Sequence, residues 1–187
     1  MHSSNILLLT GKSGSGKSQI LSSVLLELEP TGLKTGGILA PGRYLKNGEK
    51  VFDLELLPGD EKYFLSTRNK QSDWKAIGSF WFNPIAVEAG LKHLSVLGHQ
   101  NYDLCFVDEI GPFELDGELW SSAIPILLNT GIPMIWTLRP GILDQVCLKW
   151  GLINPTIVYL SEEISPNSKS IIRDWIWKNF PDHPRIS

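Results

Sequence analysis

Cysteine and histidine are both scarce in this sequence. Its 187 residues include only two cysteines and four histidines. Cys105 and Cys147 each lie inside an apolar segment, where a small buried thiol is the ordinary outcome, and the histidines show no spacing typical of metal ligands. These features argue against a disulfide-bonded secreted scaffold and against a zinc site, and they favour a cytoplasmic protein.

Long apolar runs and an excess of one charge are also missing. The apolar run at residues 6–9 is too short for the core of a signal peptide and lacks a basic flank. No stretch approaches the roughly 20 apolar residues of a membrane span. The net charge of −3 and the isoelectric point near 5.8 provide no basic field for nucleic acid or an anionic membrane. We therefore expect neither as a partner.

The composition is otherwise that of a globular protein. Hydrophobic residues make up 42% of the chain, which is enough to bury a core. The 17 glycines and 12 prolines separate apolar runs instead of clustering, which indicates turns and not disorder. No linker or repeat is visible, and we expect one domain that spans residues 1–187.

Strand-like apolar runs alternate with segments of helical periodicity. The expected strands are 5–10, 36–40, 103–108, 133–138 and 156–160, and the expected helices are 19–28, 84–98, 119–128, 142–150 and 167–180. Asn47-Gly48 indicates a hairpin turn within residues 43–57, and the hairpin continues towards 63–65. This order predicts a three-layer α/β fold, with a mostly parallel sheet, helices on both faces and a β-hairpin insertion.

A complete phosphate-binding motif follows the first expected strand. It matches G-x-x-x-x-G-K-[ST] and reads Gly11-Lys12-Ser13-Gly14-Ser15-Gly16-Lys17-Ser18. Glycines allow backbone N–H groups to surround phosphates, and the start of the next helix adds positive potential. We expect Lys17 to contact the β- and γ-phosphates and Ser18 to bind Mg²⁺, as in other P-loop nucleoside triphosphatases (NTPases). An accidental glycine- and serine-rich turn is the alternative.

Two further expected strands end in charged residues. Asp108-Glu109 closes the apolar run 104–107, and Arg139 follows the strand 133–138. Carboxyl ends of parallel strands form the ligand-binding edge of such a sheet, so these residues are expected to face the crevice of the P-loop. If the strand ending at Asp108 neighbours the first strand, Asp108 would help to bind Mg²⁺ and Glu109 would polarise the attacking water. Helix caps or turn residues are the simpler alternative.

Arg139 and a group of aromatic residues are further candidates for the site. The Arg139 guanidinium would stabilise charge on the transferred phosphoryl group, although a solvated or paired arginine is also common at a strand end. Four aromatic residues lie between the hairpin and the next helix, where core packing is the simplest role and stacking on a base is the alternative: Trp74, Phe80, Trp81 and Phe82.

With both motifs in place, the chain resembles the THEP-type (cancer-related) nucleoside-triphosphatases. Residues 107–115, which read Val-Asp-Glu-Ile-Gly-Pro-Phe-Glu-Leu, are similar to the family signature D-E-I-G-x-x-E-L. The resemblance implies a compact P-loop fold of the catalytic-glutamate type and slow, Mg²⁺-dependent hydrolysis of ATP, GTP and other nucleoside triphosphates. It implies the roles given above for Lys17, Ser18, Asp108 and Glu109. At the two variable positions of the signature the chain has Pro112 and Phe113, where family members often have Lys and Met.

Two other functions use the same motifs. A small-molecule or nucleotide kinase also needs a P-loop, but the arginines here are scattered singly and no basic lid is visible. A GTP-dependent switch is suggested by D-x-x-G at residues 108–111, but the later strands are not followed by the guanine-reading motif Asn-Lys-x-Asp. Hydrolysis is the primary prediction, and these two remain alternatives.

Overall fold

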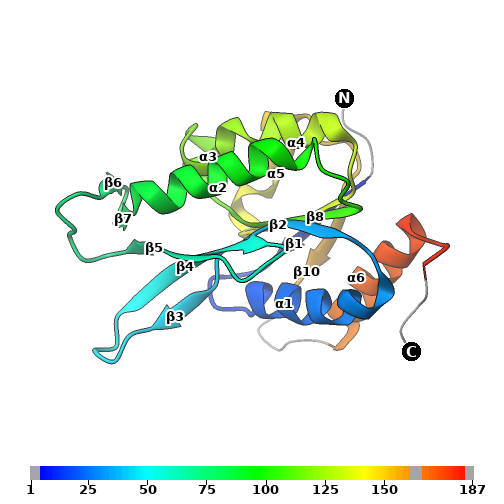
Figure 1. Cartoon of the computed structure of the whole chain (residues 1–187), viewed down its shortest axis with the longest axis horizontal. Coiled ribbons are helices and arrows are strands. Elements are labelled where there is room, and N and C mark those ends of the chain that lie inside the picture. The colour runs from blue at the N-terminus through cyan, green and yellow to red at the C-terminus, as the bar shows by residue number, and fades with distance from the viewer. Residues whose placement is uncertain (1–4, 161–165, 184–187) are drawn as a thin grey trace.

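One mixed sheet organises the chain. The computed structural model describes residues 5–160 and 166–183. Ten strands form the sheet in the order β10-β1-β9-β8-β2-β4-β5-β7-β6, and β3 pairs with β4 beside this path (Figure 1). The expected α/β fold is confirmed.

The parallel part of the sheet contains five strands. They are β10 (Thr156–Tyr159), β1 (Ile6–Thr10), β9 (Met134–Leu138), β8 (Leu104–Ile110) and β2 (Thr35–Leu39). All five residues of β1 and of β9 are buried, as is usual where helices cover both faces of a sheet. Strands β1 and β8, which carry the two motifs, are not neighbours, because β9 lies between them.

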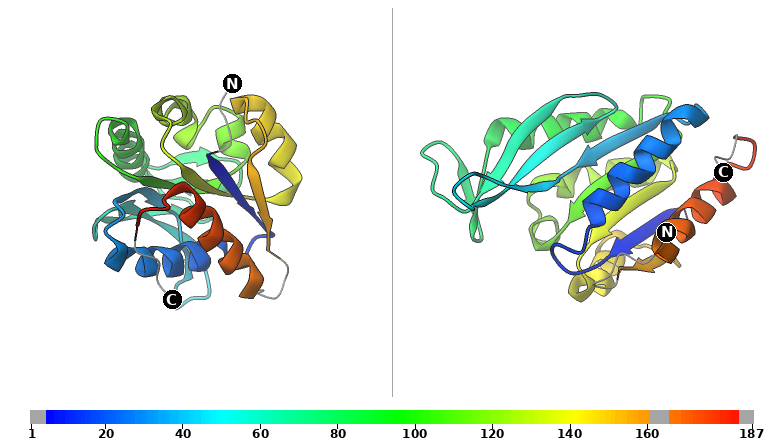
Figure 2. Two further views of the ribbon diagram at one scale, coloured as in Figure 1. Left: turned by 90° about the vertical axis from the view of Figure 1, so that its right-hand side faces the viewer. Right: turned by 90° about the horizontal axis from the view of Figure 1, so that it is seen from below.

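Helices form a layer on each face, as Figures 1 and 2 show. One layer contains α2 (Pro84–Leu97), α4 (Ile124–Thr130) and α5 (Leu143–Trp150), and the other contains α1 (Lys17–Leu28) and α6 (Pro166–Asn179). Successive side chains of a strand point to opposite faces, so Leu8 joins the core under the first layer while Leu7 and Leu9 join the core under the second. None of the helices in the described ranges is long and apolar enough to cross a bilayer.

The expected hairpin insertion is larger than the sequence indicated. Its strands are β3 (Gly42–Tyr44), β4 (Lys50–Leu57), β5 (Lys62–Thr67), β6 (Lys75–Ile77) and β7 (Phe80–Phe82). The turn at Asn47-Gly48 is confirmed, and Gly48 has a φ of 81°. Because β4 pairs antiparallel with β2, the insertion continues the main sheet. The three-residue strands β6 and β7 were not predicted.

The expected helix 119–128 is divided in two. Leu119–Ser122 forms the 3₁₀ helix η2, and α4 begins only at Ile124. Pro125 explains the break, because proline has no N–H group and its ring clashes with the carbonyl four residues earlier in a continuous helix. Three other short elements connect the main ones: η1 (Glu29–Thr31), α3 (Pro112–Leu115) and η3 (Pro140–Ile142).

Strands β2 and β8 meet with almost no space between them at Gly37. Its φ is 121°, a left-handed conformation that L side chains rarely adopt, and a Cβ atom there would lie 1.9 Å from the carbonyl oxygen of Phe106. Only glycine allows β2 to pair with β8 at this point.

We predict that Gly37→Ala lowers the free energy of unfolding by at least about 3 kcal/mol or prevents folding. Alanine would be strained at this backbone conformation, and its Cβ atom would also overlap the Phe106 carbonyl oxygen. Urea unfolding of both variants tests this. Gly141→Ala is the matched control, since no atom lies within 4 Å of a Cβ at Gly141. Equal unfolding midpoints for the two variants would contradict the prediction.

Candidate active site

The glycine-rich loop leads directly from β1 into α1. Gly14 and Gly16 have φ values of 84° and 86°, so both need the left-handed freedom of glycine. Gly16 precedes the first turn of α1 without a side-chain cap, which leaves that turn's N–H groups for another acceptor. The first residue of the loop is tied to the sheet, since the N–H of Gly11 donates to the Leu138 carbonyl at 3.3 Å.

Lys17 extends back along the inside of this loop. Its side chain is only 6% exposed, and Nζ donates to the carbonyl oxygens of Gly11 at 2.7 Å and Lys12 at 3.1 Å. Burial lowers the pKa of Lys17, while the charges of Glu109 and Asp108 act in the opposite direction. The ammonium group is therefore close enough to interact electrostatically with the carboxylates of Glu109 and Asp108.

Asp108 is fixed at the junction of three strands. It is 1% exposed, and its two carboxylate oxygens accept hydrogen bonds from different neighbours. The Thr137 hydroxyl of β9 donates to Oδ1, and the Ala40 N–H, just after β2, donates to Oδ2 at 3.1 Å. A buried carboxylate needs such donors because it has lost those of water. Asp108 is thus held rigidly at the carboxyl edge of the sheet.

Glu109 and Arg139 form an ion pair at the same edge. Arg139 Nε donates to Glu109 Oε1 at 3.2 Å, and both side chains are partly exposed. Arg139 follows β9, which lies between β1 and β8, so it is well placed to reach both motif strands. The structure brings Lys17, Asp108, Glu109 and Arg139 together at this edge, as the sequence indicated.

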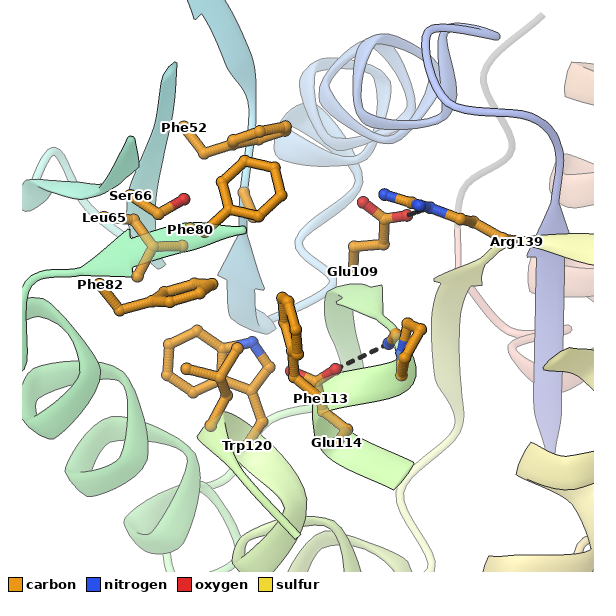
Figure 3. Close-up of a pocket in the computed structure, with 14 residues that line it drawn as sticks. Phe52, Leu65, Ser66, Phe80, Phe82, Glu109, Phe113, Glu114, Trp120 and Arg139 are labelled. Atoms are coloured by element: carbon orange, nitrogen blue, oxygen red, sulfur yellow. Dashed lines mark hydrogen bonds and ion pairs between the residues drawn. The ribbon is translucent and has the colours of Figure 1, made fainter. Parts of the chain in front are cut away.

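An aromatic cavity opens beside this ion pair (Figure 3). Its lining includes Glu109 and Arg139 together with rings from β4, β7, α3 and η2. These rings are Phe52, Phe80, Phe82, Phe113 and Trp120. Of the four aromatic residues singled out in the sequence, Phe80 and Phe82 line the cavity, whereas Trp74 packs edge-to-face on Phe64 with centroids 4.9 Å apart.

The sequence did not predict this cavity, because its walls come from seven separate segments of the chain. The available signal was the pair Pro112 and Phe113, which stands where members of the family often have Lys and Met. Both line the cavity. Thr137 and Ala40, which hold Asp108, were also missed, since neither stands out as a residue type at a strand end.

Glu114 is a buried acid in the lining of the cavity. It is 2% exposed, and Oε2 accepts a hydrogen bond from the Gly111 N–H at 2.7 Å. Burial raises the pKa of Glu114 to about 8, and the negative charge of Glu109 adds to this rise. The carboxyl group is therefore mainly protonated at neutral pH.

This raised pKa makes stability depend on pH. The pKa of Glu114 is about 8 in the folded protein and about 4.5 in the unfolded chain, so the folded protein keeps a proton that the unfolded chain releases. The stability that this group contributes is therefore lost as the pH rises from about 4.5 to about 8. The side chain of Glu114→Gln stays neutral and still accepts the hydrogen bond of the Gly111 N–H. We predict that the free energy of unfolding of this variant falls less than that of the wild type between pH 6 and 8.5. Urea midpoints at both pH values test this, with the exposed Glu88→Gln as control. Identical pH dependence in wild type and Glu114→Gln would show that Glu114 is charged in the folded protein.

A parallel sheet with a glycine-rich loop and a row of charged side chains at its carboxyl edge places the protein in the class of P-loop NTPases. Comparison with known proteins makes this specific. The chain belongs to the NTPase_1 family, whose model, described as NTPase, matches residues 6–149. It is a nucleoside-triphosphatase of the THEP type.

Two relatives illustrate the similarity. The nucleoside-triphosphatase THEP1 of Ignicoccus hospitalis is 28% identical over 143 residues, which cover 76% of this chain and 80% of the relative. The crystal structure of THEP1 from the hyperthermophile Aquifex aeolicus has the same fold, with a TM-score of 0.66 at 18% identity. That match covers 91% of this chain and 96% of the other chain.

Proposed function

We propose that this protein cleaves the terminal phosphate from Mg²⁺-bound ATP, GTP and other nucleoside triphosphates, with water as the acceptor. The observation that carries the proposal is the convergence of Lys17, Asp108, Glu109 and Arg139 at one sheet edge, beside the loop 11–18. Family membership supports hydrolysis, and the side chains at this edge provide the groups that hydrolysis needs.

The loop residues bind the triphosphate in this proposal. The loop from Gly11 to Ser18 surrounds the phosphates, and the N–H groups at its end, at the uncapped start of α1, supply donors and positive potential. Lys17 exchanges its carbonyl partners for oxygens of the β- and γ-phosphates. Because the ammonium group is almost buried, its attraction to a phosphate is weakly screened by solvent.

The oxygen ligands at this edge fit Mg²⁺. The hydroxyl of Ser18 and the carboxylate of Asp108 are the hard donors this ion prefers, and Mg²⁺ usually takes only one or two protein ligands besides phosphates and water. Each Asp108 oxygen accepts one hydrogen bond from the protein and keeps a further lone pair, so Asp108 would hold the ion either directly or through a bound water. When bound, Mg²⁺ neutralises charge on the β- and γ-phosphates.

Glu109 and Arg139 carry out the chemistry. Glu109 accepts a proton from the attacking water while the water oxygen bonds to the γ-phosphorus, and the bond to the bridging oxygen breaks to release the nucleoside diphosphate. The Arg139 guanidinium stabilises the negative charge of the transferred phosphoryl group. Its ion pair with Glu109 keeps both groups oriented towards the same position before substrate binds.

The proposal places this reaction in the cytoplasm and in one domain. Cys105 and Cys147 are both unpaired thiols, as expected for a reducing compartment. The acidic isoelectric point near 5.8 gives no support for a nucleic-acid partner.

We predict that Lys17→Ala weakens nucleoside triphosphate binding by roughly 10²-fold or more, since it removes the buried cation set against the phosphates. Titration calorimetry with a non-hydrolysable ATP analogue and Mg²⁺ measures this. Lys46→Ala removes an exposed lysine from the β3–β4 turn and serves as control. Affinity equal to that of the wild type would remove the basis for phosphate binding at this loop.

The Glu109→Gln variant separates binding from chemistry. Glutamine keeps the size and reach of the side chain but cannot accept a proton at neutral pH, so turnover should fall by roughly 10²-fold or more while affinity is retained. Phosphate release and nucleotide affinity are measured on the same preparation, with Glu88→Gln as control. Parallel loss of both quantities would instead indicate that Glu109 acts through metal or nucleotide binding.

A further inference from the structure

The aromatic cavity is preformed by its own rings. Phe80 meets Phe52 with centroids 5.8 Å apart and an interplanar angle of 72°, and Phe82 meets Phe113 at 5.5 Å and 85°. Phe80 and Phe113 also pack edge-to-face, at 6.5 Å. These contacts link β4, β7 and α3, and edge-to-face packing is the arrangement that aromatic rings favour. The walls therefore hold their shape without a ligand.

The partly open cavity fits a small ring. The cavity has a volume of about 90 Å³. One water molecule needs a cavity of roughly 10–15 Å³, so this cavity accepts about six to nine groups of the size of water. A single six-membered ring is of this size. The rings of the cavity wall lie at steep angles to one another, so a flat aromatic ligand can contact both ring edges and ring faces.

Polar groups lie at only a few points of the lining. The Ser66 hydroxyl points towards the space between the rings, and the Glu109–Arg139 pair lies across from it (Figure 3). Few polar groups in an apolar pocket fix the orientation of a ligand. A ring that fills the apolar part would place a hydroxyl substituent near the Glu109 carboxylate, which accepts a hydrogen bond from it.

The nucleotide itself does not account for this cavity. In the proposed function Glu109 and Arg139 face the terminal phosphate, whereas the nucleoside lies at the other end of the triphosphate. The cavity shares Glu109 and Arg139, so it adjoins the terminal phosphate on the side from which an acceptor attacks. The hydroxyl group of a second molecule bound in the cavity would take the place of the attacking water.

We propose that the aromatic cavity binds a single-ring aromatic alcohol and that the bound hydroxyl accepts the terminal phosphoryl group. The hydroxyl oxygen bonds to the γ-phosphorus, its proton passes to Glu109, and the bond between the γ-phosphorus and the bridging oxygen breaks. The products are a phosphate monoester and the nucleoside diphosphate, and the proton then leaves Glu109 for solvent. This activity rests on the proposed function, because it uses the same nucleotide site.

The test measures phosphoryl transfer with the full chain, Mg²⁺ and ATP labelled at the γ-phosphate. The acceptors are benzyl alcohol and phenol, with glycerol as the non-aromatic control, and labelled esters are separated from inorganic phosphate and identified by mass. We expect benzyl phosphate or phenyl phosphate and no glycerol phosphate. Phosphate release without either aromatic ester would overturn the proposal and leave the hydrolase function intact.

Two cavity variants locate the acceptor. Ser66→Phe fills the cavity and should reduce transfer to the aromatic alcohol by about 10-fold or more while phosphate release continues, since pocket misfit has effects of this size. Ser122→Phe makes the same change at an exposed position and should have no effect. If Ser66→Phe does not fold, Phe113→Ala should raise the KM for the alcohol and leave the KM for ATP unchanged. Equal transfer in wild type and variants would place the acceptor elsewhere.

Binding is also measured without nucleotide, which separates the two proposals. Saturation-transfer NMR should detect benzyl alcohol on the wild type and not on Ser66→Phe or Phe113→Ala. Absence of ATP turnover together with specific binding of benzyl alcohol would refute the nucleotide chemistry but keep the cavity as a ligand site. Absence of benzyl alcohol binding would overturn the ligand site itself.

Discussion

The hydrogen bonds to the buried Asp108 carboxylate fix the geometry of the charged residues at the carboxyl edge of the sheet. A carboxylate that is 1% exposed is stable in a protein interior only if neighbouring groups replace the hydrogen bonds of water. Thr137 and the Ala40 N–H do so from the two strands on either side of β8. Glu109 directly follows Asp108, and Arg139 lies two residues after Thr137. The same hydrogen bonds therefore also fix the positions of Glu109 and Arg139.

The charged groups at this edge also stabilise one another, because burial removes part of their solvation. Lys17 loses solvation inside the loop, and the nearby negative charges of Glu109 and Asp108 compensate for part of that loss. Arg139 balances Glu109 in turn through their ion pair. A site of two cations and two carboxylates is nearly neutral without substrate. A bound triphosphate would need Mg²⁺ to balance its charge, which is consistent with the proposed requirement for the metal.

The sequence predicted the parts of the fold that depend on local chemistry. Glycines at 14 and 16, the turn at Asn47-Gly48 and the start of α2 at Asn83-Pro84 all follow from backbone requirements of single residues. The position of β9 between β1 and β8 was beyond reach, because strand order depends on contacts distant in sequence. Strands β6 and β7 are too short for periodicity to reveal, and the cavity that β7 lines was missed with them.

The antiparallel extension changes the surroundings of the proposed active site. In a sheet that ended at β2, Glu109 would face solvent, and water would be the natural acceptor. Strands β4, β5 and β7 continue the sheet past β2 and bring Phe52, Phe80 and Phe82 against α3, next to Glu109. Apolar walls on this side reduce the number of water molecules that can approach and strengthen electrostatic interactions within the site. Slow hydrolysis and transfer to a bound alcohol are both consistent with this arrangement, because the same walls that restrict water provide the surface that an aromatic acceptor needs.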